Sequence, residues 1–357
     1  MSGRKKIRIG LVGCGRIASS HFGAIQNLSD QAELVAICDI DSGRLQEAAK
    51  KTGARAYPSL DLLLRDSEVD LISLCTPSGV HPEQGILAAK AGKHVLTEKP
   101  MAVHWQDGID LVQACDNAGV KLFVVKQNQL NPTIQFVKKA LDQGRLGRLH
   151  LVSSNVFWTR PQDYYDQAKW RGTWALDGGA FMNQASHYVD MMTHLGGPIA
   201  RVAAITATQA RKIEAEDSGV ATFQYVSGAL GSMSVTMLSY PKNIEGSITL
   251  LGDQGSIRVG GVALNRIEIF QLADSRPEDE AIRSVNYEPA TVYGNGHQPY
   301  YESVFAALRG ERDPLVDGRS GLVSLQTLIA IYRSAAEGRY VQLPLEGWPS
   351  EGPRRKT

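Results

Sequence analysis

IRIGLVGCGRIA, residues 7–18, contains the pattern that decides the fold. The apolar run Ile7 to Val12 predicts a buried strand, and a helix-like stretch to about Leu28 follows the glycines. Gly13 permits a tight turn, Gly15 lets a phosphate approach the backbone, and Ala18 allows the helix to pack closely on the strand. Because this glycine pattern lies between a strand and a helix, it predicts a dinucleotide site at the helix N-terminus.

The next predicted strand ends in an acidic residue, Asp39, twenty-one positions beyond Ala18. A carboxylate there accepts hydrogen bonds from the adenosine ribose hydroxyls and repels a 2′-phosphate, which favours NAD over NADP. Asp41 is the competing acid. The alternative interpretation is a glycine turn in a non-binding domain with a helix-capping aspartate.

The first third of the chain alternates short apolar runs with amphipathic stretches, a pattern typical of an α/β domain with a parallel sheet. We expect a Rossmann domain over residues 1–126. Its strand candidates are Ile7 to Val12, Leu34 to Cys38, Leu71 to Cys75, His94 to Thr97 and Leu122 to Val125. Its further helix candidates are Arg44 to Lys51, His81 to Ala91 and Trp105 to Ala118.

The remaining residues, 127–357, predict an α+β domain built on a large, open, mostly antiparallel sheet. Met233, Val235 and Met237 alternate with more polar neighbours, so one face of their strand should be apolar. The strand candidates are Leu149 to Trp158, Arg201 to Ala210, Val220 to Val226, Leu230 to Tyr240 and Ser247 to Leu251. The helix candidates are Pro132 to Gln143, Pro299 to Arg309 and Leu322 to Glu337.

Composition narrows the class of protein. The 357 residues are 43% hydrophobic and 21% charged with a formal net charge of +1, which argues against a disordered or nucleic-acid-binding protein. We find no signal peptide or membrane span and expect a cytoplasmic protein. The four cysteines show no paired spacing, so we expect no metal or disulfide, only small buried side chains.

A lysine follows the predicted strand that ends at Thr97, in the sequence Thr97-Glu98-Lys99-Pro100. Open α/β sheets bind ligands at the carboxyl ends of their strands, so nicotinamide should lie there. Desolvation and a positive nicotinamide ring would both favour the neutral form of Lys99, which could then accept a hydroxyl proton. A solvated surface lysine is the alternative.

Three motifs together resemble the glucose-fructose oxidoreductase, inositol dehydrogenase and rhizopine-catabolism family (Gfo/Idh/MocA). They are the fingerprint at Gly13, the strand end Cys75-Thr76-Pro77-Ser78 followed by His81, and Glu98-Lys99-Pro100. The resemblance implies that Lys99 is catalytic and that the preceding strand end contacts NAD. The expected cofactor-binding residues are Gly13, Gly15, Arg16, Ile17, Asp39, Thr76, Pro77, His81, Glu98, Lys99 and Gln127.

A second motif, DGGAFMNQASH at residues 177–187, is similar to the family's G-G-x-x-x-D-x-G-x-H segment. It implies that His187 and Asn183 act on the substrate beside Lys99. Spaced four apart on a helix, the two side chains would point the same way. The family usually has aspartate where Asn183 stands, and asparagine can orient a hydroxyl but cannot ionise. A purely structural histidine is the alternative.

Aromatic and arginine side chains are dense at residues 157–174, ahead of this motif. Aromatic faces stack on sugars or uracil, and arginine binds carboxylate or phosphate through two parallel hydrogen bonds. An interdomain or subunit contact is the alternative. The expected substrate-binding residues are Lys99, Thr159, Arg160, Tyr164, Trp170, Arg171, Asn183, Gln184, His187 and His297.

This combination resembles the branch of the family that oxidises UDP-N-acetylglucosaminuronic acid at C3 for surface polysaccharide precursors. The resemblance implies an NAD-dependent enzyme that acts on a sugar nucleotide. The alternatives are a cyclitol or simple-sugar dehydrogenase, a non-catalytic NAD-binding regulator, and a glycosidase that oxidises its substrate transiently. We expect a homo-oligomer, a dimer or tetramer, because the second face of the large sheet could meet another subunit.

Overall fold

The computed structural model describes residues 5–289 and 296–348. The chain divides into two compact units. Within the described residues, the first unit comprises 5–125, 297–322 and 347–348, and the second comprises 126–289, 296 and 323–346. The expected boundary after residue 126 lies next to the observed one. Residues 297–322, which we had expected in the second domain, pack instead with the first unit.

The first unit contains a six-stranded parallel sheet in the order β3-β2-β1-β4-β5-β6. Its central strands are apolar and buried, as a parallel sheet covered on both faces requires. The predicted α/β class and parallel sheet are confirmed. The strands are β1 (Ile7–Val12), β2 (Ala32–Cys38), β3 (Arg55–Tyr57), β4 (Leu71–Leu74), β5 (His94–Thr97) and β6 (Leu122–Val124).

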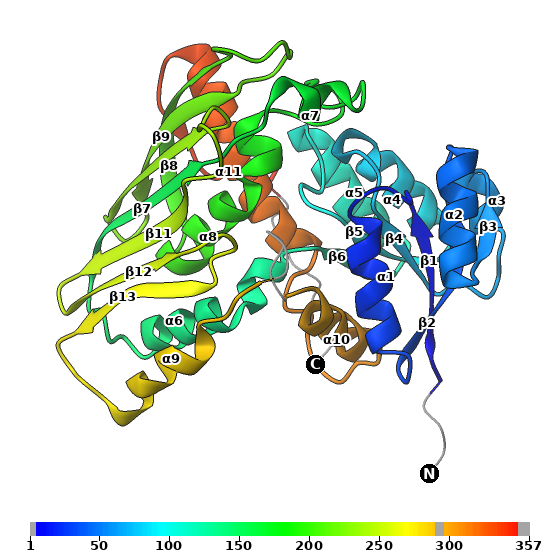
Figure 1. Cartoon of the computed structure of the whole chain (residues 1–357), viewed down its shortest axis with the longest axis horizontal. Helices are drawn as coiled ribbons and strands as arrows, with labels where there is room; N and C mark the ends of the chain where they lie inside the picture. The colour runs from blue at the N-terminus through cyan, green and yellow to red at the C-terminus, as the bar shows by residue number, and fades with distance from the viewer. Residues whose placement is uncertain (1–4, 290–295, 349–357) are drawn as a thin grey trace. The chain divides into compact units, whose positions relative to one another are not determined.

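Short helices connect these strands, and local sequence sets where they begin and end (Figure 1). The Asp41 side chain accepts the backbone N–H groups of Gly43 and Arg44 and so caps α2, which ends at Gly53 with a φ of 72°. The helices are α1 (Ala18–Asn27), α2 (Ser42–Thr52), α3 (Leu60–Leu64), α4 (His81–Lys90) and α5 (Trp105–Asn117).

A late helix, α10 (His297–Leu308), completes the first unit by packing against α1. Tyr300 and Tyr301 of α10 are fully buried. The Tyr300 hydroxyl donates to the backbone carbonyl of Val124, at the end of β6, at 2.5 Å. A segment far along the chain therefore supports the carboxyl edge of the parallel sheet.

The second unit contains an eight-stranded sheet in the order β13-β12-β11-β7-β10-β9-β8-β14. Neighbouring strands run antiparallel except β7 and β10, which pair in parallel, so the expected mostly antiparallel sheet is confirmed. Its strands are β7 (Leu149–Phe157), β8 (Ile199–Ala207), β9 (Ser218–Tyr225), β10 (Leu230–Thr236), β11 (Glu245–Gly252), β12 (Gly255–Gly260), β13 (Arg266–Leu272) and β14 (Val341–Gln342).

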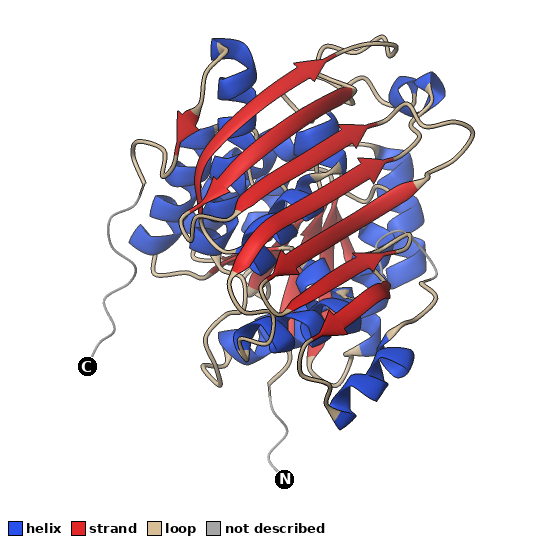
Figure 2. Cartoon of the chain, turned by 90° about the vertical axis from the view of Figure 1, so that its left-hand side faces the viewer, coloured by secondary structure: helices blue, strands red, loops and turns tan. Residues whose placement is uncertain are grey.

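One face of this sheet is covered by helices, and the other is turned toward the viewer in Figure 2. The predicted alternation on β10 is confirmed, because Met233 and Val235 are buried while Ser234 and Thr236 are partly exposed. The helices of this unit are α6 (Pro132–Asp142), α7 (Gln162–Asp166), α8 (Ser186–Gly196), α9 (Ile282–Val285) and α11 (Gly318–Glu337), the last beginning in the first unit. Among the described residues, no helix is long and apolar enough to cross a membrane.

Candidate active site

The glycine turn after β1 has the geometry that a dinucleotide site requires. Gly13 has a φ of 93°, and a Cβ on it would lie 2.7 Å from the Cys75 carbonyl oxygen, so glycine is required for the turn itself. A Cβ on Gly15 would meet nothing within 4 Å, which leaves room beside the backbone at this point. Arg16 is exposed and Ile17 precedes the first turn of α1.

The Asp39 carboxylate lies directly beside this turn. Its Oδ2 accepts the backbone N–H of Cys14 at 2.7 Å, and its Oδ1 accepts the N–H of Asp41 at 2.8 Å. Asp41, the competing acid, is engaged as the N-cap of α2. The glycine turn and Asp39 together therefore fit an adenosine diphosphate, with phosphate at the α1 N-terminus and ribose at the end of β2.

The strand ends after β4 and β5 are joined by a buried histidine, His81. Its Nε2 lies 2.8 Å from the Thr76 carbonyl oxygen and its Nδ1 lies 3.0 Å from that of Pro100. Burial lowers the pKa of His81, so the ring is neutral and donates through one nitrogen. His81 therefore lies between the two predicted cofactor-contacting segments and donates to the carbonyl of one of them. Pro77 lies between Thr76 and the short helix that begins at Ser78.

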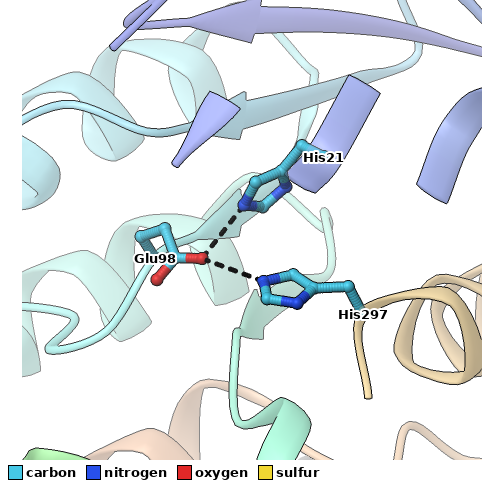
Figure 3. Close-up of side chains that lie close together, drawn as sticks. All are labelled: His21, Glu98 and His297. Atoms are coloured by element: carbon cyan, nitrogen blue, oxygen red, sulfur yellow. Dashed lines mark hydrogen bonds and ion pairs between the residues drawn. The ribbon is translucent and has the colours of Figure 1, made fainter. Parts of the chain in front are cut away.

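Glu98 is buried directly before Lys99, between two histidines (Figure 3). Its Oε1 accepts a hydrogen bond from His21 Nε2 at 3.0 Å, and His297 Nε2 lies 3.9 Å from the same oxygen. Its Oε2 accepts the backbone N–H of Lys99 at 3.1 Å. Burial alone would raise the pKa of Glu98, but the hydrogen bond from His21 and the nearby His297 hold it well below its ordinary value, so the group is ionised.

His297 lies in the first unit beside Glu98 and is 7% exposed. Helix α10 packs on α1, and the centroid of the His297 ring lies 5.5 Å from that of the His21 ring. The expected contact of His297 with the substrate stays a prediction. Sequence reasoning also missed His21, whose only signal was its position on the buried face of α1, three residues after Ala18.

In the second unit, Asn183 and His187 lie on different kinds of helix. Residues Ala180–Gln184 form a π-helical turn, and α8 begins at Ser186, so the expected i,i+4 geometry of one regular helix is wrong. The Asn183 amide donates to the Asp177 carboxylate, and its Oδ1 accepts from Gln184 Nε2 at 3.1 Å. Single-turn π segments often occur at functional sites.

His187 contacts Gln127, which we had expected to bind the cofactor. The two Nε2 atoms are 3.3 Å apart, and Gln127 is buried. Behind them, Lys126 and Asp190 form a buried ion pair at 2.5 Å, and Gln129 donates to the second oxygen of Asp190 at 2.8 Å. No local sequence pattern indicates this ion pair, which connects the start of the second unit to α8.

A buried glutamate, Glu216, forms a hydrogen bond to the π-helical turn. Its Oε1 accepts the backbone N–H of Phe181 and the hydroxyl of Tyr332, both at 2.8 Å. Its Oε2 is buried with no hydrogen-bond partner among the described residues. Burial raises the pKa of Glu216 to about 7. A Cβ on Gly179 would overlap this carboxylate, which explains why the second glycine of the motif must be glycine.

The predicted aromatic and arginine residues form one cluster in the second unit. The Tyr164 ring lies between two guanidinium groups, with Arg160 Cζ 5.4 Å and Arg171 Cζ 4.3 Å from its centroid. Arg160 Nε also donates to Gln184 at 2.8 Å, and its Nη1 donates to the Thr159 carbonyl at 2.8 Å. The structure therefore brings Thr159, Arg160, Tyr164, Arg171 and Gln184 together, with Trp170 stacked near Arg171.

A parallel sheet with a glycine turn, an aspartate directly after the second strand and a lysine at a strand end defines a Rossmann-type oxidoreductase. Two family descriptions match the chain: "Oxidoreductase family, NAD-binding Rossmann fold" over residues 7–126, and "Oxidoreductase family, C-terminal alpha/beta domain" over residues 138–343. The chain belongs to this oxidoreductase family, Gfo/Idh/MocA, and NAD is its cofactor.

Two solved structures are similar over nearly the whole chain. The WlbA dehydrogenase from Bordetella pertussis, in complex with NADH and UDP-GlcNAcA, is 57% identical, with a TM-score of 0.94 and coverage of 96% of this chain and 99% of that one. The WlbA dehydrogenase from Chromobacterium violaceum, with the same two ligands, is 54% identical, with a TM-score of 0.92 and coverage of 97% and 98%. D-apiose dehydrogenase from Paraburkholderia graminis is 29% identical over 95% of this chain and 90% of its own length.

Proposed function

We propose that this protein oxidises the 3-hydroxyl of UDP-N-acetylglucosaminuronic acid to the 3-keto sugar, with NAD⁺ as the oxidant. The observation that carries the proposal is the identity of over 50%, along nearly the full chain, to two dehydrogenases that bind NADH and UDP-GlcNAcA. Identity to D-apiose dehydrogenase, which acts on a free sugar, is only 29%. This difference favours a sugar nucleotide over a cyclitol or simple sugar.

Different residues of the first unit bind different parts of the cofactor. The turn at Gly13 and Gly15 and the N-terminus of α1, with Arg16 and Ile17, receive the pyrophosphate. Asp39 accepts hydrogen bonds from the ribose hydroxyls, and the segments held by His81, including Thr76 and Pro77, line the nicotinamide end. When bound, NAD⁺ accepts the hydride from C3 of the sugar.

Three side chains act on the substrate hydroxyl in this proposal. Lys99 accepts the 3-hydroxyl proton, and His187 orients that hydroxyl or shares the proton. Asn183 holds the hydroxyl in place through its amide, because it cannot ionise. The hydrogen bonds of Asn183 to Asp177 and Gln184 keep the amide in one orientation, as positioning requires.

The cluster of Arg160, Tyr164 and Arg171 is suited to the uronic acid and the uracil. Two guanidinium groups offer bidentate hydrogen bonds to a carboxylate, and an aromatic ring between them offers a stacking face. Thr159, Trp170 and Gln184 complete the substrate contacts in this account. Such a site should discriminate against substrates that lack the carboxylate.

The proposal is tested by measuring NADH formation at 340 nm with a matched set of substrates. UDP-N-acetylglucosaminuronic acid should be oxidised, whereas UDP-N-acetylglucosamine, which carries a hydroxymethyl group in place of the carboxylate, should react far more slowly. Free myo-inositol and glucose should not react. A preference for a free polyol would overturn the sugar-nucleotide assignment, and loss of the UDP group in the product would point instead to glycosidic cleavage.

We also propose that the protein is a cytoplasmic homo-oligomer that supplies surface polysaccharide synthesis. NAD and nucleotide sugars are cytoplasmic metabolites, and the oxidised sugar is a precursor for further modification. The uncovered face of the large sheet carries exposed apolar side chains, among them Ile205 on β8 and Val220 on β9, which are register partners. Sedimentation should find a dimer or tetramer, and a lone subunit at working concentration would contradict this.

A further inference from the structure

The cluster of His21, Glu98 and His297 is built around the residue that precedes Lys99 (Figure 3). Both carboxylate oxygens of Glu98 are engaged, one by His21 at 3.0 Å and the other by the backbone N–H of Lys99 at 3.1 Å. The backbone N–H of Glu98 donates to the Leu74 carbonyl at 3.0 Å. The peptide bond between Glu98 and Lys99 is therefore held by the Glu98 side chain as well as by backbone hydrogen bonds.

A second line of hydrogen bonds fixes His21 in turn. Its Nδ1 lies 2.8 Å from the Tyr301 hydroxyl, and that hydroxyl lies 3.3 Å from Ser73 Oγ. Burial lowers the pKa of His21, so its ring is neutral. A neutral ring that donates from Nε2 to the Glu98 carboxylate must accept at Nδ1, which makes Tyr301 the donor there.

These contacts leave the carboxylate only one favourable arrangement. Glu98, His21 and Tyr301 are almost completely buried, and a buried charge that loses a partner costs several kcal/mol. The carboxylate therefore cannot rotate without giving up a charge-assisted hydrogen bond. Movement of Glu98 would break its hydrogen bond to the Lys99 backbone N–H. A rigid Glu98 therefore restricts the position of Lys99.

We propose that the His21–Glu98–His297 cluster, with Tyr301 behind it, is a positioning device that holds Lys99 in the orientation needed for proton transfer. This inference rests on the proposed function, in which Lys99 takes the substrate proton. In this role the histidines and Glu98 act through the Lys99 backbone. Because His297 and Tyr301 come from α10, the late helix completes the catalytic edge of the first unit.

Two neighbouring tyrosines provide a matched test. Tyr301→Phe removes the hydroxyl that holds His21, whereas Tyr300→Phe removes an equally buried hydroxyl on the same helix that donates to the Val124 carbonyl instead. Both variants should lose similar thermal stability. Only Tyr301→Phe should lower kcat, by about tenfold or more, with the KM for the sugar nucleotide changed by less than about threefold.

A readout that needs no turnover separates this inference from the proposed function. Trace acetylation of Lys99 in the NADH complex, followed by peptide mass spectrometry across pH, reports the reactivity of its amine. Tyr301→Phe and Glu98→Gln should change the Lys99 labelling rate, and Tyr300→Phe should leave it unchanged. If wild-type protein fails to oxidise the sugar nucleotide, the proposed function fails, but the labelling comparison still decides the inference.

Three results would overturn the inference. One is equal Lys99 labelling in wild type and Tyr301→Phe, and another is an equal loss of kcat in the two tyrosine variants. The third concerns metals, because one donor atom each from His21, Glu98 and His297 lies within 4.8 Å of the others. Stoichiometric zinc in the purified protein, absent from Glu98→Gln, would make the cluster a metal site instead.

Discussion

The backbone N–H of Cys14 donates to the carboxylate of Asp39 at 2.7 Å, which ties the glycine turn to the end of the next strand. Cys14 is the residue between Gly13 and Gly15, so this bond sets the distance between the glycine turn and Asp39. The residues to which we assign the pyrophosphate and the ribose are therefore one hydrogen-bonded unit. Changes to Asp39 should affect cofactor selectivity more than folding, because Cys14 is held by the turn as well.

Asp39→Asn should raise the KM for NAD by about tenfold and reduce the preference for NAD over NADP. The amide keeps one acceptor oxygen for Cys14 but loses the charge that repels a 2′-phosphate. Steady-state KM values for both cofactors measure the change. Asp41→Asn is the control, because asparagine also caps helices well and should leave selectivity intact; an unchanged NAD/NADP ratio in Asp39→Asn would refute the ribose role.

Gly15→Ala should weaken cofactor binding, whereas Gly13→Ala should destabilise the fold. A Cβ on Gly15 meets nothing within 4 Å, so the folded protein should retain its unfolding temperature but lose NADH affinity by about tenfold or more. Gly13→Ala places a side chain at a φ of 93° against the Cys75 carbonyl and should cost about 1–3 kcal/mol of stability. Thermal unfolding and NADH titration separate the two; undiminished NADH binding by Gly15→Ala would argue against pyrophosphate at this turn.

Glu216 should make stability depend on pH. Its pKa is raised by burial to about 7, from an ordinary value of 4.5, so the folded protein binds this proton more tightly than the unfolded chain. Stability is then lost as pH rises from about 4.5 to about 7, by about 3 kcal/mol for this group. Glu216→Gln keeps an acceptor for Phe181 and Tyr332 without the charge.

Unfolding temperatures from pH 5 to pH 8 measure this contribution. The wild type should lose stability relative to Glu216→Gln as pH increases across this range. Parallel curves for the two proteins would mean that the carboxyl has an ordinary pKa.

Arg160→Met and Arg171→Met should identify the group that recognises the uronic acid. The arginine that binds the carboxylate should, when replaced, raise the KM for UDP-N-acetylglucosaminuronic acid by about tenfold or more. The same change should matter little for UDP-N-acetylglucosamine. The measurement is the kcat/KM for UDP-N-acetylglucosaminuronic acid divided by that for UDP-N-acetylglucosamine. If neither variant lowers this ratio, the arginine cluster does not bind the carboxylate.

Much of the first unit could be predicted because its strands are continuous apolar runs. Ile7–Val12 and His94–Thr97 were predicted with the observed bounds, and Asp39 was located by its place at a strand end. The short strand β3 was missed because Arg55–Tyr57 is largely exposed and lacks an apolar pattern. In the second unit, β12 and β13 were missed, although Ile257 and Val259 in one and Ile267 and Ile269 in the other alternate with polar residues as in half-buried strands.

The candidate site was harder to predict than the fold, because its supporting contacts join residues distant in sequence. The contact between His21 and Tyr301 spans 280 positions, and no local pattern indicates it. Glu216 was missed for the same reason, since the residues that it supports, such as Phe181, lie in an earlier segment. The π-helical turn at Ala180–Gln184 could not be told from an α-helix by residue spacing.

Lys99→Met should abolish turnover while leaving NADH binding intact. Methionine preserves much of the apolar length of the side chain but cannot accept a proton, so kcat should fall by about 10²-fold or more. NADH fluorescence titration provides the control for cofactor binding. Turnover at the wild-type rate would remove Lys99 from the chemistry.

Hydride transfer from C3 of the sugar nucleotide to NAD⁺ can be followed with UDP-N-acetylglucosaminuronic acid deuterated at C3. The labelled substrate is incubated with protein and NAD⁺, and the cofactor is then released by denaturation for mass spectrometry. We expect reduced cofactor that carries one deuterium. Reduced cofactor without deuterium, or no reduced cofactor at all, would contradict this expectation.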